Sequence, residues 1–64
     1  MKVYITLRGR WLDSPEDMEF FIASKCIRLL DSSNILHKAT SLAETTAYEY
    51  ESKYIITKIE ITIG

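Results

Sequence analysis

Cysteine, glycine and proline are all scarce in this chain of 64 residues, which contains one cysteine, two glycines and one proline. A single cysteine excludes an internal disulfide framework and a cysteine-rich zinc module. Two glycines are too few for a glycine-rich loop that binds phosphate groups. No histidine pair or oxygen-ligand loop has the spacing of a metal site. We therefore expect neither a metal nor another cofactor.

A long apolar run is also absent, and so is a strong charge of one sign. No stretch approaches the ~20 apolar residues that span a bilayer, and the first residues alternate polar with apolar instead of forming the apolar core of a signal peptide. The net charge of −1 is far from the basic balance of a general nucleic-acid binder. Because the chain cannot form an internal disulfide, we expect a cytoplasmic protein without membrane contact.

The length bounds the architecture. Residues 1–64 suffice for a single small domain, and a hydrophobic content of 47% excludes a disordered tail. In a chain this short, apolar burial nearly balances the entropy lost on ordering. We expect a marginally stable monomer that burial against a partner would stabilise.

The first residues predict a half-buried strand that ends near residues 9–11. Val3, Ile5 and Leu7 share one side of a period-2 pattern. The other side carries Lys2, Tyr4, Thr6, Arg8 and Arg10.

The next segment carries helix-start signals. Ser14 can cap a helix, Pro15 suits the first helical position, and Asp17 can close a variant capping box. We predict a helix from Pro15 to about Asp31. Its apolar residues sweep about 200° of the helical wheel, which is wider than one sheet covers. We therefore expect Phe20, Ala23 and Ile27 to bind a partner, a second copy of the chain above all, unless the following segment covers them.

The second half of the chain predicts a short helix and two strands. Apolar residues at helical spacing favour a helix from Ile35 to Glu44, although a loop remains possible there. The strand-forming residues from Thr45 to Glu51 favour a strand, and the isoleucine-rich segment from Tyr54 to Ile63 predicts another. The apolar faces of these two strands match in a hairpin.

Together these elements predict an α+β fold in the order strand, helix, optional second helix, strand, strand. We expect a small, mainly antiparallel three-stranded sheet, with one or two helices packed on one face. The C-terminal strand is the most apolar and should lie centrally, which gives the strand order 1-3-2. By size and arrangement the chain is similar to many small bacterial and bacteriophage proteins that act by binding, which is an analogy only.

The outward face of the first strand is the most informative polar pattern. Basic side chains beside an aromatic ring on an open sheet can bind single-stranded nucleic acid, but acidic residues are expected nearby and a solvated outer face is the default. The residues that could form this nucleic-acid or protein-contact face are Lys2, Tyr4, Arg8, Arg10, Trp11 and Lys58.

Catalytic candidates are few. His37 has no nucleophile or carboxylate placed beside it by any local motif and is expected at the surface, and Cys26 is expected in the apolar core, where a thiol is inert. We expect no catalytic residues and no enzymatic activity. The leading hypothesis is a protein–protein interaction module with a regulatory role. It would form a homodimer and bind a cellular or host protein, as a small bacteriophage inhibitor does. The alternative is a small nucleic-acid-binding protein.

Overall fold

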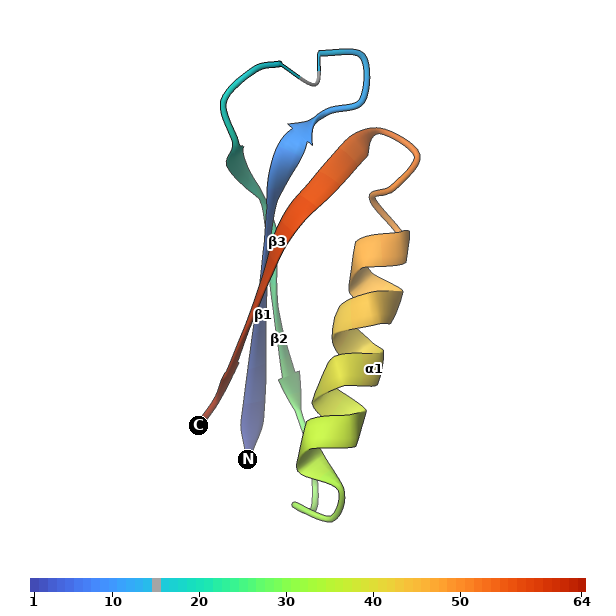
Figure 1. The fold of residues 1–64 in the computed structure, drawn as a ribbon. Coiled ribbons are helices and arrows are strands. Elements are labelled where there is room, and N and C mark those ends of the chain that lie inside the picture. Colours follow the sequence, from blue (N-terminus) through green and yellow to red (C-terminus); the bar gives the residue numbers. More distant parts are fainter. Residues whose placement is uncertain (15) are drawn as a thin grey trace.

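A computed structural model describes residues 1–14 and 16–64 and confirms the α+β class. The elements follow the order β-β-α-β (Figure 1): β1 (Lys2–Trp11), β2 (Phe20–Arg28), α1 (Ile35–Tyr48) and β3 (Tyr54–Ile63). The three strands form one antiparallel sheet with α1 packed along one face. The helix start predicted at Pro15 lies outside the described residues.

The central strand is β1, and its alternating pattern sets the core. Val3, Ile5 and Leu7 have no exposed surface, whereas Tyr4 between them is 41% exposed. Both neighbouring strands pair antiparallel with β1 along most of its length. Its apolar side chains therefore point at α1 from the middle of the sheet, as the period-2 pattern predicts.

Small residues let α1 lie close to the sheet. Ala39, Ala43 and Ala47 are buried on the side of the helix that faces β1 and β3. The helix continues past the predicted end at Glu44 because Thr46 and Ala47 pack into the core. The Thr46 hydroxyl also donates a 2.7 Å hydrogen bond to the Leu42 carbonyl. The predicted strand over residues 45–51 is therefore wrong: burial outweighs the strand propensity of its threonines and tyrosines.

The predicted helix from residue 15 to 31 is also wrong, because residues 20–28 form β2. A 200° apolar arc arises when a strand with apolar residues on both faces is projected on a helical wheel. In the strand period, Ala23 and Ile27 pair with Leu7 and Val3 on the helix side, and Phe21 lies opposite Arg8 on the other side. The apolar arc of about 200° therefore results from applying the helical period to residues that form a strand.

The strand order is β2-β1-β3, so the predicted order 1-3-2 is a second correction. Strands β1 and β2 follow each other along the chain and pair as a hairpin, and α1 then carries the chain across to the other side of β1. The most apolar strand, β3, consequently lies at an edge. The analogy to small binding proteins fails with the predicted strand–helix–strand order on which it rested.

Two irregularities shift the pairing near the end of β1, and in each the extra residue lies on the neighbouring strand, so β1 keeps its own alternation. The pairing with β2 slips between Leu7 and Arg8, and the pairing with β3 slips between Arg8 and Gly9. Gly9 is buried where the strands meet, and a Cβ atom there would collide with the carbonyl oxygen of Ile55. This close approach of backbones explains why a glycine occupies the strand interior.

Candidate interaction surfaces

No helix or strand of the described residues packs on the face of the sheet opposite α1. Its central row is Tyr4, Thr6 and Arg8 of β1. Tyr4 is 41% exposed and Phe21 is 54% exposed, so aromatic rings lie open to solvent on this side. The row is flanked by Cys26, Ser24 and Phe21 of β2 and by Thr62, Glu60 and Lys58 of β3.

Carboxylates pair with two of the basic residues on this open face. The Arg8 guanidinium donates a 3.0 Å hydrogen bond to Glu19, and the Thr57 hydroxyl donates one of 2.8 Å to the other Glu19 oxygen. Both hydrogen bonds lower the pKa of Glu19 below its ordinary value, and the bond from Thr57 has the largest effect. Lys58 lies 3.6 Å from Glu60 on the same face. Arg8 and Lys58 thus already have anionic partners, which weakens any attraction for phosphate groups.

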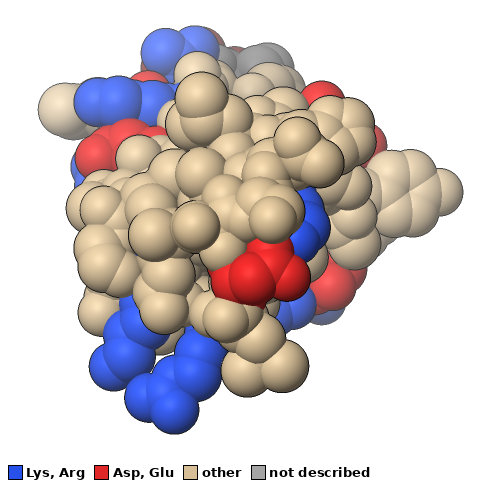
Figure 2. Space-filling model, turned by 90° about the horizontal axis from the view of Figure 1, so that it is seen from below, with Lys and Arg blue, Asp and Glu red and all other residues tan. Residues whose placement is uncertain are grey.

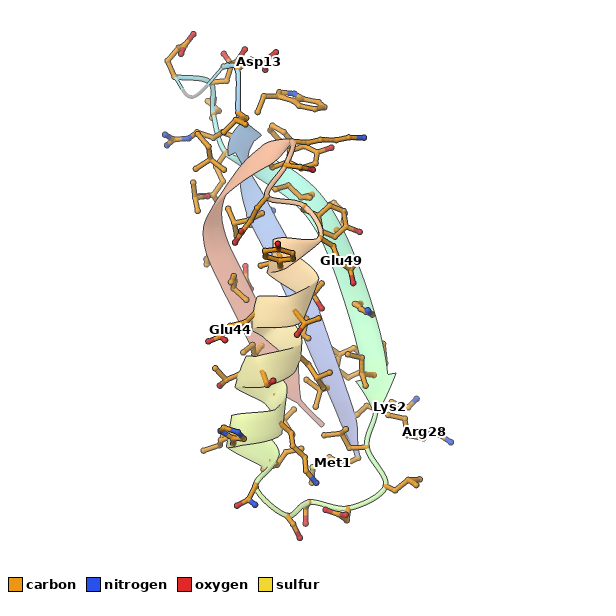
Figure 3. The ribbon with its side chains drawn as sticks, turned by 90° about the vertical axis from the view of Figure 1, so that its right-hand side faces the viewer. Met1, Lys2, Asp13, Arg28, Glu44 and Glu49 are labelled. Carbon is orange, nitrogen blue, oxygen red and sulfur yellow. The ribbon has the colours of Figure 1, made fainter. Side chains whose placement is uncertain are left out.

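Basic side chains also gather at the end of the molecule that holds both termini. Lys2 and Arg28 occupy paired positions on β1 and β2 and project from the same end of the sheet (Figure 3). Viewed from this end, one group of Lys and Arg side chains protrudes at the lower left of a largely uncharged surface, and further charged side chains lie around its rim (Figure 2). A shallow hollow here is lined by Met1, Lys2, Tyr4, Arg28, Leu29, Leu30 and Gly64.

Trp11 does not join the open face as predicted. Its ring lies 4.8 Å from that of Tyr54 and 5.7 Å from that of Phe20, measured between centroids. Tyr50, which follows α1, packs against the core and contacts Tyr54, so this aromatic cluster lies on the helix side of the sheet. Alternation along β1 already places Trp11 on this side, because it stands at an odd position like Val3, Ile5 and Leu7, so its assignment to the outward face was wrong.

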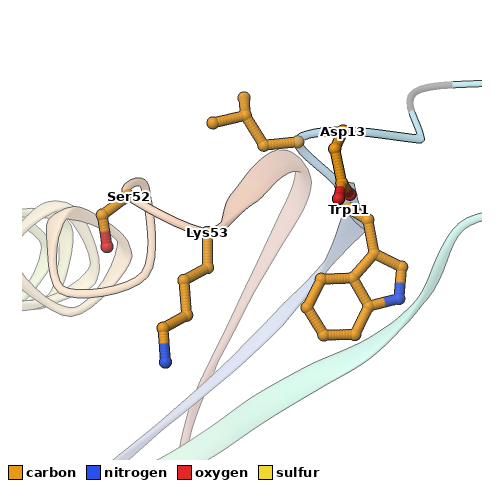
Figure 4. Close-up of a pocket in the computed structure, with 5 residues that line it drawn as sticks. Trp11, Asp13, Ser52 and Lys53 are labelled. Carbon is orange, nitrogen blue, oxygen red and sulfur yellow. The ribbon is translucent and has the colours of Figure 1, made fainter.

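A small open hollow lies at the end of the aromatic cluster, between the connection that follows β1 and the connection that precedes β3 (Figure 4). The Trp11 indole and the Lys53 side chain border it, with Asp13 and Ser52 at its rim. The backbone N–H of Leu12 donates a 3.0 Å hydrogen bond to the Lys53 carbonyl and holds the two connections together. Trp11 therefore packs within the aromatic cluster, although 46% of it remains exposed. Arg10, the remaining residue of the predicted face, pairs with Ile55 and is half-buried.

The predicted partner-binding residues Phe20, Ala23 and Ile27 do not form a helical seam, because they belong to β2. All three are half-buried within the chain's own fold. Phe20 packs on Trp11, and Ile27 packs against the core cluster. The surface on which the predicted dimer rested is therefore largely covered by the chain's own fold.

The two chemically reactive side chains lie apart. His37 is exposed on α1, as expected, whereas Cys26 is exposed on β2, which corrects the prediction of a core cysteine. Among the described residues, no three His, Cys, Asp or Glu side chains converge in a way that could hold a metal. Within the same residues no helix is long and apolar enough to cross a membrane.

The outer edge of β3 is an open sheet edge, although the sequence predicted this strand to lie in the centre of the sheet. Lys2 and Gly64 exchange two backbone hydrogen bonds of 2.8 and 2.9 Å. In an antiparallel ladder such pairs alternate with pairs that make no hydrogen bond to each other. The backbone N–H and C=O groups of Ile59, Ile61 and Ile63 therefore point away from β1, toward the open edge.

The same isoleucines leave apolar surface open beside these backbone groups. Ile59 and Ile61 are 41% and 39% exposed, although their partners on β1, Leu7 and Ile5, are fully buried. Leu36 on α1 is 72% exposed. The β3 edge thus combines unpaired strand backbone with uncovered apolar side chains, which is a template for pairing with another strand.

The opposite edge of the sheet differs in character. The backbone carbonyl of Met1 accepts a 2.8 Å hydrogen bond from the backbone N–H of Leu29. Because hydrogen-bonded pairs alternate along an antiparallel ladder, the backbone groups of Ser24 and Cys26 point toward the open edge of β2. On the helix side of this edge lies Lys25, whose ammonium group is 3.9 Å from Glu49. An inward-pointing lysine discourages strand addition, and no residue of this kind lies on the helix side of β3 between Ile59 and Ile63.

Compared with known protein families, curated proteins and solved structures, the chain shows no significant match. The chemistry of the surfaces therefore carries the functional argument.

Proposed function

We propose that this protein is a non-enzymatic protein–protein interaction module that binds an extended polypeptide strand along the open edge of β3. Strand addition gains affinity from backbone hydrogen bonds and specificity from alternate side chains. The observation that carries the proposal is the conjunction, at Ile59 and Ile61, of outward backbone groups and half-exposed apolar side chains. The proposal includes a regulatory role in the cytoplasm, in which the β3 edge binds a cellular or host protein and acts by occupying part of it.

The amount of exposed surface supports a binding role. The chain exposes 4570 Å², whereas a folded monomer of its mass exposes about 4,200 Å² on average. Among the described residues, the buried core consists of six apolar side chains, three of them alanines. Burial of the β3 edge would add apolar contacts that the small core lacks.

Selection of displayed peptides on the immobilised protein tests the proposal. We expect extended peptides rich in β-branched residues to be enriched, and their binding to fail on an Ile61→Lys variant. The matched control is Ser24→Lys, which places the same charge on the β2 edge. Circular dichroism confirms the fold of each variant. Failure to enrich any peptide, or equal binding to both variants, would overturn strand addition at β3.

A second candidate function, nucleic-acid binding, is favoured by one observation: Lys2, Arg28 and the half-exposed Tyr4 surround one hollow. Phosphate binding releases counterions, so affinity would fall steeply with salt. A Lys2→Glu, Arg28→Glu double variant should then lose binding to a single-stranded oligonucleotide in a filter or fluorescence assay. Unchanged weak binding by that variant would exclude this surface.

A further inference from the structure

We propose that the strand that occupies the β3 edge is β3 of a second copy, antiparallel to the first, with the twofold axis at Ile61. This inference rests on the proposed function and names its partner. A twofold axis perpendicular to the sheet pairs one surface with itself, so the edge must complement its own sequence. The charges and isoleucines of β3 can therefore be tested against axes at Ile59, Glu60 and Ile61.

Only some registers place the isoleucines of both copies on the helix side. Side chains alternate between faces, so residues 59, 61 and 63 must pair among themselves. An axis at Glu60 would set two Glu60 carboxylates directly opposite each other, which is unfavourable. An axis at Ile59 would pair Lys58 with Glu60, but would place Ile61 opposite Thr57, where the pairing of β3 with β1 is irregular.

The axis at Ile61 satisfies every position of the regular part of β3. Ile61 lies opposite Ile61 of the second copy, and Ile59 lies opposite Ile63. The outward backbone groups of all three isoleucines find partners, because residues of this set form the hydrogen-bonded pairs. On the other face Glu60 lies opposite the uncharged Thr62. This register joins apolar to apolar and places no like charges opposite each other.

The helix contributes to the same flank. Glu44 projects from α1 on the side toward β3, whereas Glu49 projects toward β2 (Figure 3). At about 100° per residue, Leu36 lies between the buried face of the helix and the Glu44 side. Figure 1 shows that α1 begins near the end of the molecule where β3 ends. The exposed Leu36 therefore lies toward the region in which a second copy would pack.

The resulting assembly closes after two copies. Its six-stranded sheet runs β2-β1-β3 and then the same strands in reverse, so both outer edges are β2. Each of these edges carries Lys25 on the helix side, which disfavours further strand addition. The proposal thus accounts for a dimer instead of a fibre.

Removal of a single backbone donor tests the pairing without altering a side chain. A chemically synthesised chain with N-methylated Ile61 loses an N–H that makes no bond within its own sheet. We expect sedimentation equilibrium to give a dimer for the unmodified chain and a monomer for this one. A chain N-methylated at Ser24, on the β2 edge, is the matched control and should remain dimeric.

Disulfide trapping tests the register. In a Cys26→Ser background, we expect a Glu60→Cys chain mixed with a Thr62→Cys chain to form a mixed disulfide dimer under mild oxidation. A Lys58→Cys chain mixed with the Glu60→Cys chain should form several-fold less. The reverse preference would place the axis at Ile59 and overturn the proposed register.

The outcomes separate this inference from the proposed function. A monomer at every concentration, with peptides still bound at β3, would overturn self-pairing and leave strand addition standing. A dimer that is insensitive to N-methylation of Ile61 would overturn self-pairing through β3. If the selected peptides also failed to distinguish the two edges, strand addition itself would fall.

Discussion

Replacing each of two directly paired isoleucines by alanine, one at a time, compares the stability that a buried and a half-exposed side chain contribute. Ile5 on β1 and Ile61 on β3 are cross-strand partners on the helix side. They have the same side chain and differ in burial, because Ile5 is 0% exposed and Ile61 is 39% exposed. The pair therefore isolates the contribution of the missing cover at the β3 edge.

The expected magnitudes follow from the burial. Truncation of isoleucine to alanine removes about three carbon groups, worth about 2.4 kcal/mol at ~0.8 kcal/mol each when fully buried. At Ile5 the cavity left in the core raises the loss to about 4 kcal/mol. At Ile61 the side chain is only about three-fifths buried and solvent fills the gap, so we expect a loss of about 1.5 kcal/mol.

Urea denaturation followed by circular dichroism gives both free energies of unfolding, from the midpoint and slope of each transition. The measurement is made at the lowest practical protein concentration, so that the monomer dominates. Equal losses for Ile5→Ala and Ile61→Ala would refute the reasoning, because they would mean that both side chains are equally covered in the isolated chain.

Three further outcomes are expected. Gly9→Ala should destabilise the fold by about 3 kcal/mol, because its methyl group would meet the Ile55 carbonyl oxygen; thermal unfolding tests this, and an unchanged midpoint would show that the strands can separate at no cost. The pKa of Glu19 is lowered from 4.5, so its stabilising effect is present above pH 4.5 and is lost as the pH falls through the lower folded value. Stability curves of the wild type and Glu19→Gln should therefore converge in acid, and a constant difference would contradict the hydrogen-bonded arrangement. The exposed thiol of Cys26 should react with a maleimide in the native protein at a rate near that of the unfolded chain, as mass spectrometry would show; strong protection would place Cys26 in an interface.

The sequence was informative where one period dominated. Val3, Ile5 and Leu7 alternate cleanly, and the isoleucines of β3 do the same, so both strands were predictable with nearly their observed bounds. The start of α1 at Ile35 was likewise predictable from helical spacing. These segments have one apolar face each, which only one period can explain.

The second strand could not be predicted from its own residues. Ser14 and Asp17 provide good helix-start chemistry, and apolar residues on both sides of β2 imitate a broad helical arc. Tertiary pairing with β1 decides the outcome, since the hairpin buries Ile27 opposite Val3. The same non-local pairing decides that β3 lies at an edge, which local pattern cannot reveal.

The candidate surface was only partly visible in the sequence. Tyr4 and Arg8 lie on the open face as predicted, because β1 alternates, and Lys58 lies there as the partner of Arg8. Trp11 lies on the helix side with Leu7 and Gly9, and the ion pair of Arg8 with Glu19 joins β1 to the residue that precedes β2. The side of Trp11 follows from the period-2 pattern, whereas the ion pair does not, because Glu19 lies outside the strands.

The most direct measurement is the exchange of the Ile61 backbone amide with deuterium at increasing protein concentration. The amide points away from β1, so in the monomer it should exchange almost as fast as in an unfolded peptide. Self-pairing at β3 predicts that its protection grows with concentration, while the amides of Ser24 and Cys26 at the β2 edge stay unprotected. Fast exchange of Ile61 at every concentration, or equal protection of both edges, would contradict the account.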